Sequence, residues 1–289
     1  IWEPAWRQDT RHLRPFRTQA GVKARGCSRR LERVLTDFGA EEAFAPAAAR
    51  VREHYGVEVN ASRVRRVCLH HADKLAAAPV KPCTTLRAQG PAWIVAEADG
   101  CMLPIVETTA APPAADKRRH RQVRWQEARA VAAQTLGEVT VHYDATLGEV
   151  AEAGARWSRV AHAAGWGVGT RIHALGDGAP WLAQQASVCF GTCSTYLLDL
   201  YHVCDYLAAV WPGDKTTVQA HRDALKAGRH EQVFTALRDR LEAPELPDEQ
   251  APARCALRYL ENRREQLDYP GALAAGLPPL MVAAERVAT

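Results

Sequence analysis

The sequence predicts an α/β protein: a ribonuclease-H-like mixed sheet with flanking helices, preceded by a small all-α helix-turn-helix module. Three observations predict this division. Residues 31–78 carry the apolar spacing of helices, a stretch rich in proline and glycine follows at 79–92, and from Trp93 onward short apolar runs alternate with helical segments. We therefore expect a basic arm or truncated N-terminal region at 1–30, the helical module at 31–78, a linker at 79–92 and the α/β domain at 93–289.

The charge of the chain is unevenly distributed. The whole chain of 289 residues carries a formal net charge of +4, but its first 90 residues hold 17 Lys and Arg against 9 Asp and Glu, whereas the remainder holds 20 against 24. A basic first third predicts a module that binds a polyanion. No apolar run approaches the roughly 20 residues that span a bilayer, so we expect a cytoplasmic protein without a membrane partner. The eight cysteines include no Cys-x-x-Cys pair, which argues against a zinc ribbon.

The helical module has the signals of two helices joined by a short turn. Pro46 suits the first turn of a helix that runs to Tyr55 and stops at Gly56, and Asn60 offers a cap for a second helix. This order is what a helix-turn-helix requires, since the glycine permits the tight turn. The second helix would expose three arginines that can reach phosphates and guanine edges: Arg63, Arg65 and Arg66. The alternative is an ordinary helical hairpin with a solvated basic face.

The order of elements in the α/β domain is more informative than any one of them. Apolar runs on both sides of Asp99-Gly100 predict a strand that ends at Asp99 and a second that returns. Further strands are expected at 123–131, 170–176 and 194–200, with helices near 149–165, 181–190 and 202–211 and a helical region at 216–274. Three strands followed by strand, helix, strand and helix is the ribonuclease-H-like arrangement, and the inference is one of fold analogy.

Two Asp-Gly steps in this domain suggest a metal site. Asp99 and Asp177 each follow a short apolar strand, and adjacent strand ends can bring two carboxylates together. Crowded carboxylates repel each other unless a divalent cation lies between them, and Mg²⁺ (or Mn²⁺) prefers oxygen ligands and bound phosphates. The alternative is that each Asp-Gly is an ordinary turn.

Three segments carry a resemblance to a known family. They are Asp99-Gly100 with Met102 and Pro104, the segment Leu175-Gly176-Asp177-Gly178-Ala179-Pro180-Trp181-Leu182, and the segment Leu198-Asp199-Leu200-Tyr201-His202. Together they resemble bacterial insertion-sequence transposases of the ISKra type, which are related to the Mutator group and have a ribonuclease-H-like core with a DDE motif. The segments Tyr259–Arg263 and Gly276-Leu277-Pro278 resemble the same family, so the resemblance covers nearly the whole chain.

The resemblance implies roles for individual residues. Asp99 and Asp177 match the first two metal-binding carboxylates, and Asp199 with His202 matches the Asp-x-x-His pair that follows. Asp199 is equally suited to cap the helix it precedes. Glu285, which lies 108 residues after Asp177, is in register for the third carboxylate, although the Gly-Ser-Gly turn usual before it is absent. Glu261 and Glu265 are the fallback carboxylates, with a solvated helix face as their alternative.

The expected function is DNA transposition. The resemblance implies Mg²⁺-dependent cleavage at the ends of an insertion sequence, followed by attack of the freed 3′-hydroxyl on target DNA. The expected partners are double-stranded DNA, both element ends and target, and further copies of the chain in a DNA-bound homo-oligomer at the nucleoid. Two alternatives stay open: a ribonuclease-H-like nuclease without strand transfer, and a truncated, catalytically incompetent copy that only binds DNA. The start at Ile1 and the end at Thr289 favour a truncated copy.

Overall fold

The chain divides into two compact units, residues 1–81 and 82–289, and the boundary falls inside the predicted linker. The computed structural model describes residues 27–77, 85–108 and 121–281, and before residue 27 only short stretches, among them the antiparallel strands β1 (Trp6–Gln8) and β2 (Arg11–Leu13). Residues 85–92 belong to the second unit, because the carbonyl of Arg87 accepts from Val168 N–H at 2.9 Å. No helix among the described ranges is both long and apolar enough to cross a membrane.

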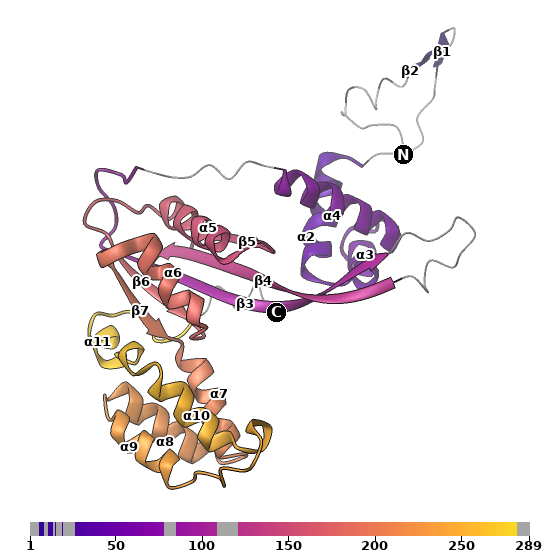
Figure 1. Cartoon of the computed structure of the whole chain (residues 1–289). Helices are drawn as coiled ribbons and strands as arrows, with labels where there is room; N and C mark the ends of the chain where they lie inside the picture. The colour runs from indigo at the N-terminus through magenta and orange to yellow at the C-terminus, as the bar shows by residue number, and fades with distance from the viewer. Residues whose placement is uncertain are drawn as a thin grey trace. The chain divides into compact units, whose positions relative to one another are not determined.

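The first unit contains three helices that pack on one another: α2 (Arg29–Glu41), α3 (Phe44–Tyr55) and α4 (Ala61–Ala76) (Figure 1). The Asn60 side chain caps α4 by accepting from Arg63 N–H at 2.8 Å, and α3 ends at Gly56, which has a φ of +62°. The core is a small set of fully buried side chains: Leu35, Ala47, Val51 and Val64. The helix pair expected on either side of Gly56 is confirmed.

The second unit is built on a mixed five-stranded sheet. Its strands are β3 (Trp93–Thr108), β4 (Arg121–Thr135), β5 (His142–Thr146), β6 (Arg171–Gly176) and β7 (Ser194–Leu198), in the order β5-β4-β3-β6-β7. The pairs β5–β4 and β4–β3 are antiparallel, whereas β3–β6 and β6–β7 are parallel. The prediction of an α/β unit with a mixed sheet behind a helical region is confirmed.

The expected break at Asp99-Gly100 is wrong. β3 continues through both residues to Thr108, and its antiparallel partner is β4, with Asp99 opposite Ala130. An Asp-Gly step is compatible with a strand when the cross-strand pairing continues, and the apolar residues on both sides are typical of one long strand as much as of two. Sequence reasoning therefore divided one strand into two and missed β5, a short edge strand whose Asp144 forms an ion pair with Arg156 at 2.8 Å.

Beyond Gly100, β3 and β4 leave the sheet as a two-stranded ribbon, since β6 pairs only as far as Ala98 and β5 only as far as Arg129, which is opposite Gly100 (Figure 1). Side chains alternate between the two faces of such a ribbon. By this alternation, one face carries apolar residues that are exposed to solvent: Met102, Pro104, Val106, Val123 and Trp125.

Helices cover both faces of the sheet. On one face, α5 (Val150–Ala163) and α6 (Pro180–Phe190) enclose a core that includes Ile94, Ile172 and Trp157. The other face, which carries Val95 and Leu175, packs into a core shared with the C-terminal helices. These are α7 (Leu200–Val210), α8 (Lys215–Lys226), α9 (His230–Arg238), α10 (Pro252–Glu261) and α11 (Tyr269–Ala274). The helical region expected at 216–274 is confirmed.

After α11 the chain returns to the sheet. The carbonyl of Pro278 lies 2.8 Å from His173 Nε2, and the carbonyl of Pro279 accepts from Leu200 N–H at 3.0 Å. Met281, which is buried, donates its N–H to the Asp199 carboxylate at 3.0 Å. The end of the described chain therefore lies beside the carboxyl end of β7.

Candidate active site

Three parallel strands reach the same row of the sheet, and an aspartate follows in each. The last paired residues are neighbours across the strands: Ala98, Gly176 and Leu198. The residues that come next are Asp99, Asp177 and Asp199. Asp177 and Asp199 lie just beyond the ends of β6 and β7, and Asp99 lies beside them within β3, so the register brings the three residues together at this point of the sheet.

Asp99 lies within β3 and is 9% exposed. Its Oδ1 accepts from Gly100 N–H at 2.8 Å. Burial is the largest influence on this carboxyl and raises its pKa, the charges of Asp177 and Asp199 raise it further, and the Gly100 hydrogen bond and His202 oppose the rise. Asp177, Asp199 and His202 are thus close enough to Asp99 to act on it electrostatically.

Asp177 stands in the loop between β6 and α6. Its Oδ1 accepts from Ala179 N–H at 2.8 Å, and Pro180 begins α6 directly afterwards. Gly178 has a φ of +84°, in the left-handed region that favours glycine. The turn therefore holds the Asp177 carboxylate beside the first residues of a helix, where the helix dipole stabilises negative charge.

Asp199 is fully buried and caps α7. Its carboxylate accepts from the N–H groups of Tyr201 and His202, each at 3.3 Å, and from Met281 N–H. Its Oδ2 also lies 2.8 Å from His202 Nδ1, and this hydrogen bond is the main cause of the raised pKa of His202. Asp199 therefore fixes the His202 ring, with Nδ1 towards the carboxylate. The expected cap is confirmed, and His202 lies in the first turn of α7.

Asp99 and Asp177 each keep one carboxylate oxygen available for a ligand. In the described part of the chain, backbone N–H groups engage Oδ1 of both Asp99 and Asp177, and no donor reaches Oδ2 of either. Across the described residues no group of three His, Cys, Asp or Glu side chains has the geometry to hold a metal ion. Glu285, the expected third carboxylate, lies outside the described residues. A pair of carboxylates still suits Mg²⁺, which retains waters and binds through one or two carboxylates plus substrate phosphates.

Sequence reasoning missed a buried carboxylate that precedes Asp99 on β3. Glu97 is 2% exposed and precedes Asp99 by two residues on β3, so both side chains project from the same face. The signal was present in the alternation Val95-Ala96-Glu97-Ala98-Asp99, where two acidic residues occupy successive positions of one face of an apolar strand.

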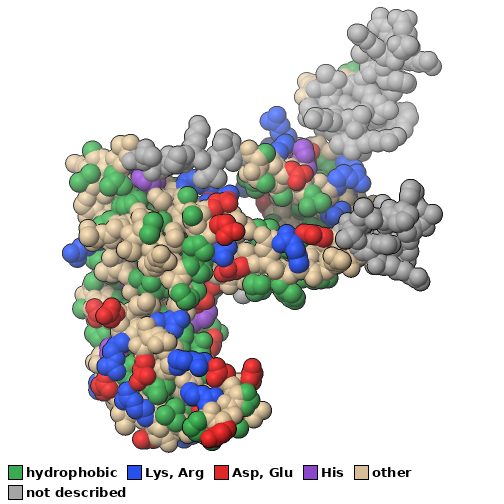
Figure 2. Space-filling model, viewed as in Figure 1, with side chains coloured by type: hydrophobic (Ala, Val, Ile, Leu, Met, Phe, Trp, Pro, Cys, Tyr) green, Lys and Arg blue, Asp and Glu red, His purple; other side chains and the backbone are tan. Residues whose placement is uncertain are grey.

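The fallback carboxylates are on the surface. Glu261 and Glu265 are both exposed, and Glu261 pairs with Arg238 at 2.7 Å. Figure 2 shows basic and acidic side chains interspersed over the region of α8 to α10. Both side chains are solvated, as their alternative expected, but they do not share one helix face, because α10 ends at Glu261 and Glu265 lies in a separate 3₁₀ turn at Arg264–Gln266.

In the first unit, the three arginines do not share one environment. Arg65 and Arg66 are exposed and line a shallow surface on α4 together with Ser62, Leu69, His70 and Asp73. Arg63 is half-buried and donates from Nη2 to Cys27 Sγ at 3.1 Å, towards the start of α2. The structure thus places two of the three on the outer face of the helix and directs the third along its side.

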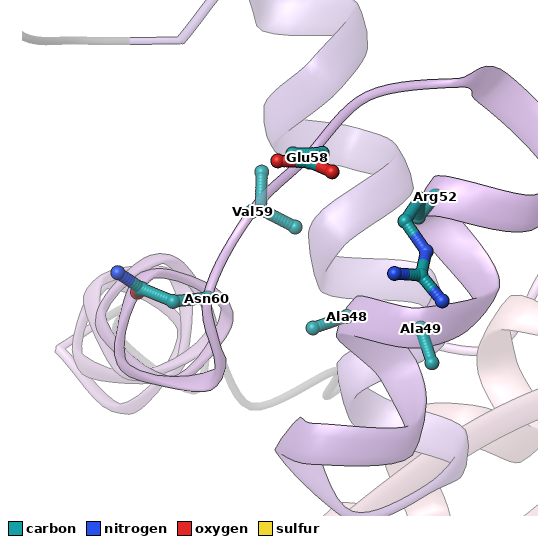
Figure 3. Close-up of a pocket in the computed structure, with 6 residues that line it drawn as sticks. All are labelled: Ala48, Ala49, Arg52, Glu58, Val59 and Asn60. Carbon is teal, nitrogen blue, oxygen red and sulfur yellow. The ribbon is translucent and has the colours of Figure 1, made fainter.

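A second hollow in this unit lies between α3 and the segment that leads into α4. It is lined by Ala48, Ala49, Arg52, Glu58, Val59 and Asn60 (Figure 3). Figure 3 shows Arg52 reaching from α3 and Asn60 at the start of α4. Because Glu58 balances Arg52 here, this hollow lacks the basic excess of the α4 face.

No known protein-family model matches the chain, and the search of curated proteins finds no match to it.

Proposed function

We propose that the protein is a DNA transposase that cuts the ends of a mobile DNA element and joins the freed 3′ ends to target DNA. The observation that carries the proposal is the common register of Ala98, Gly176 and Leu198, which puts Asp99, Asp177 and Asp199 at one edge of the sheet. Three carboxylates at one edge are costly to assemble, so the arrangement favours a site that uses negative charge.

The topology of the sheet supports this proposal. Three antiparallel strands, β5-β4-β3, are followed by β6 and β7, both parallel to β3, which is the order and direction of a ribonuclease-H-like fold. Fold analogy alone does not define an activity. The fold analogy supports the proposal here because the aspartates directly follow Ala98, Gly176 and Leu198, which are paired neighbours on β3, β6 and β7.

In this proposal, Asp99 and Asp177 hold Mg²⁺ or Mn²⁺, and Glu285 supplies the third carboxylate. When bound, the metal would stabilise charge on the phosphate and favour attack by water or by a 3′-hydroxyl. The residues of the chain have distinct tasks: backbone N–H groups orient the two aspartates, and Asp199 orients His202. The raised pKa of His202 favours its cationic form, so we assign it a contact with the DNA backbone.

We further propose that the first unit is a helix-turn-helix that binds double-stranded DNA through α4. Arg65 and Arg66 would contact phosphates or base edges, and Arg63 would act from the side of the helix. The protein would assemble as a homo-oligomer on the element ends in the cytoplasm, at the nucleoid.

The catalytic proposal is tested by nicking and joining. The probe is a duplex taken from the DNA that flanks the gene, incubated with the full chain and Mn²⁺ and with a target plasmid. We expect wild-type protein to nick the duplex and join it to the plasmid, and Asp177→Asn to lose at least about 100-fold in rate. Nicking without joining would favour the nuclease alternative. Equal nicking by wild type and Asp177→Asn would sink the assignment, and DNA binding without nicking would leave the DNA-binding alternative.

The DNA-binding proposal is tested by the salt dependence of affinity. Removing two phosphate contacts in Arg65→Ala/Arg66→Ala should reduce the slope of log Kobs against log salt by about 1.8. The matched control is Arg33→Ala, which removes an exposed arginine of α2 that pairs with Asp37. An unchanged slope in the double variant, or an equal fall in the control, would refute the assignment of this face.

A further inference from the structure

The loop that carries Asp177 is held by side chains that lie far away in the sequence. The Tyr259 hydroxyl donates to the carbonyl of Asp177 at 2.6 Å, and Arg263 Nε donates to the carbonyl of Gly178 at 2.7 Å. On the other side, Gly178 N–H donates to the Tyr196 hydroxyl at 3.2 Å. Both backbone carbonyls that flank the turn are therefore fixed by residues of α10 and the turn that follows it.

Tyr259 and Arg263 are themselves firmly placed. The Tyr259 ring is 8% exposed and stacks on Tyr206 of α7 with ring centroids 4.0 Å apart and an interplanar angle of 15°. The Arg263 guanidinium lies 4.3 Å from the Tyr259 ring centroid, and its Nη1 donates to the Tyr259 carbonyl at 3.0 Å. Burial raises the pKa of Tyr259, which keeps its hydroxyl a neutral donor.

The fit between this pair and the loop is close. A Cβ built on Gly178 would lie 2.5 Å from Arg263 Nε and 2.6 Å from Leu198 Cδ1, closer than real Cβ atoms come to their neighbours. Leu198 directly precedes the Asp199 cap. Arg263 thus lies in van der Waals contact with the turn, and movement of the loop would have to displace it.

Among the described residues, Asp99 receives no comparable support from distant side chains. Its carboxylate accepts from the N–H of the next residue, Gly100, and its backbone is held by strand pairing with β4. Asp177 lies beyond the end of β6, where strand pairing has ceased, so its orientation depends on the side chains that contact the loop. The two carboxylates are fixed by different means, one by the sheet and one by the C-terminal helices.

We propose that Tyr259 and Arg263 are positioning residues that hold the Asp177 carboxylate in place for a divalent cation. The proposal rests on the function proposed above, and it makes the helical region a structural part of the active site. Residues that orient a metal ligand typically contribute 10-fold to 100-fold to metal affinity, so we expect about a tenfold loss in each variant.

The test measures Mn²⁺ binding to the full chain by calorimetry, without DNA, in Tyr259→Phe, Arg263→Gln and Arg263→Lys. Tyr259→Phe keeps the stacked ring and removes only the donor, so its fold is preserved. Arg264→Gln is the matched control, because Arg264 is exposed and pairs with Glu231 at 2.6 Å, away from the loop. We expect weaker Mn²⁺ binding in Tyr259→Phe and Arg263→Gln, partial recovery in Arg263→Lys, and wild-type binding in Arg264→Gln.

A purely structural role would give a different pattern of activity. Loss of positioning raises the Mn²⁺ concentration needed for half-maximal nicking, and saturating Mn²⁺ restores most of the rate. Loss of folded protein lowers the rate at all Mn²⁺ concentrations. If Tyr259→Phe and Arg263→Gln both bind Mn²⁺ as tightly as wild type while Asp177→Asn binds Mn²⁺ weakly, the positioning role is refuted and the proposed function stands. If Asp177→Asn binds Mn²⁺ as tightly as wild type, the proposed function fails and the inference fails with it.

Discussion

Like charges are buried at the sheet edge that carries the aspartates, whereas they are exposed on the outer face of α4. At the sheet edge, Asp99 and Asp199 are buried beside Asp177, whereas on α4 Arg65 and Arg66 are exposed to water. Exposed like charges cost little free energy because solvent screens them, but buried ones repel strongly unless they are paired or bind a cation. The comparison teaches that the fold gives up stability at the sheet edge. Among the contacts of the described residues, the Asp199 carboxylate has four hydrogen bonds to recover that stability, whereas Asp99 and Asp177 have one each.

The largest expected effect comes from removing Asp199 and leaving its partners in place. Asp199→Ala leaves His202 Nδ1 and the N–H groups of Tyr201, His202 and Met281 without their acceptor. We expect the free energy of unfolding to fall by about 3–5 kcal/mol, measured by urea denaturation. Asp199→Asn, which retains the shape, should lose less. A loss below 1 kcal/mol in Asp199→Ala would contradict the view that this aspartate is stabilised by its surroundings.

The matching change in the first unit should be milder. Asn60→Ala removes the side chain that caps α4 but leaves its N-terminal N–H groups near solvent. We expect a loss of about 1 kcal/mol in the free energy of unfolding of this unit, followed by circular dichroism during urea denaturation. Asn60→Ser should restore most of it. If Asn60→Ala costs as much as Asp199→Ala, the contrast between the two regions disappears.

The contribution of His202 should depend on pH. Its pKa in the folded state is raised above the ordinary value of about 6.5, chiefly by the hydrogen bond to Asp199. The stabilisation is therefore fully present below about pH 6.5 and is lost as the pH rises through the folded-state value. Urea denaturation of wild type and His202→Asn should show a larger difference at pH 5.5 than at pH 9. A difference that does not change with pH would contradict the charged pairing.

The smallest expected effect has the opposite sign. The pKa of Asp99 is raised in the folded state, so its ionisation destabilises the fold as the pH rises from about 3.9 through the raised value. Metal-free Asp99→Asn should therefore be slightly more stable than wild type at neutral pH, and the two should converge in acid. Added Mg²⁺ should reverse the order, since only wild type retains the full site. Thermal unfolding with and without Mg²⁺ measures both outcomes, and a less stable metal-free variant would contradict the account.

Much of the fold was predictable because its signals are local. The Gly56 turn, the Asn60 cap and the start of α6 at Pro180 each depend on residues within a few positions of one another. The break at Asp99-Gly100 was predicted wrongly because turn and strand differ there only in whether a distant partner, β4, continues the pairing. β5 was missed because its short, mixed pattern is stabilised by ion pairs from α5.

The candidate site divides in the same way. Asp99 and Asp177 could be named from the apolar runs that precede them, and Asp199 with His202 from a motif. The contact of Tyr259 with the Asp177 loop joins residues 82 positions apart, and no local pattern contains it. Glu97 could have been found, because alternation in β3 puts it on the same face as Asp99.

Because β3 is continuous, the number of residues in it determines on which face of the sheet, and how far along the strand, Asp99 lies. Deleting or inserting one residue between Trp93 and Asp99 would turn Asp99 to the face covered by α5 and α6, and the exposed apolar row of the ribbon would change sides with it. A change of two residues would keep the face but shift Asp99 by about 6.6 Å along the strand. The number of residues between Trp93 and Asp99 is therefore constrained as strictly as the identity of the aspartate. In this segment we expect insertions to be tolerated poorly, whereas exchanges of one apolar residue for another are tolerated well.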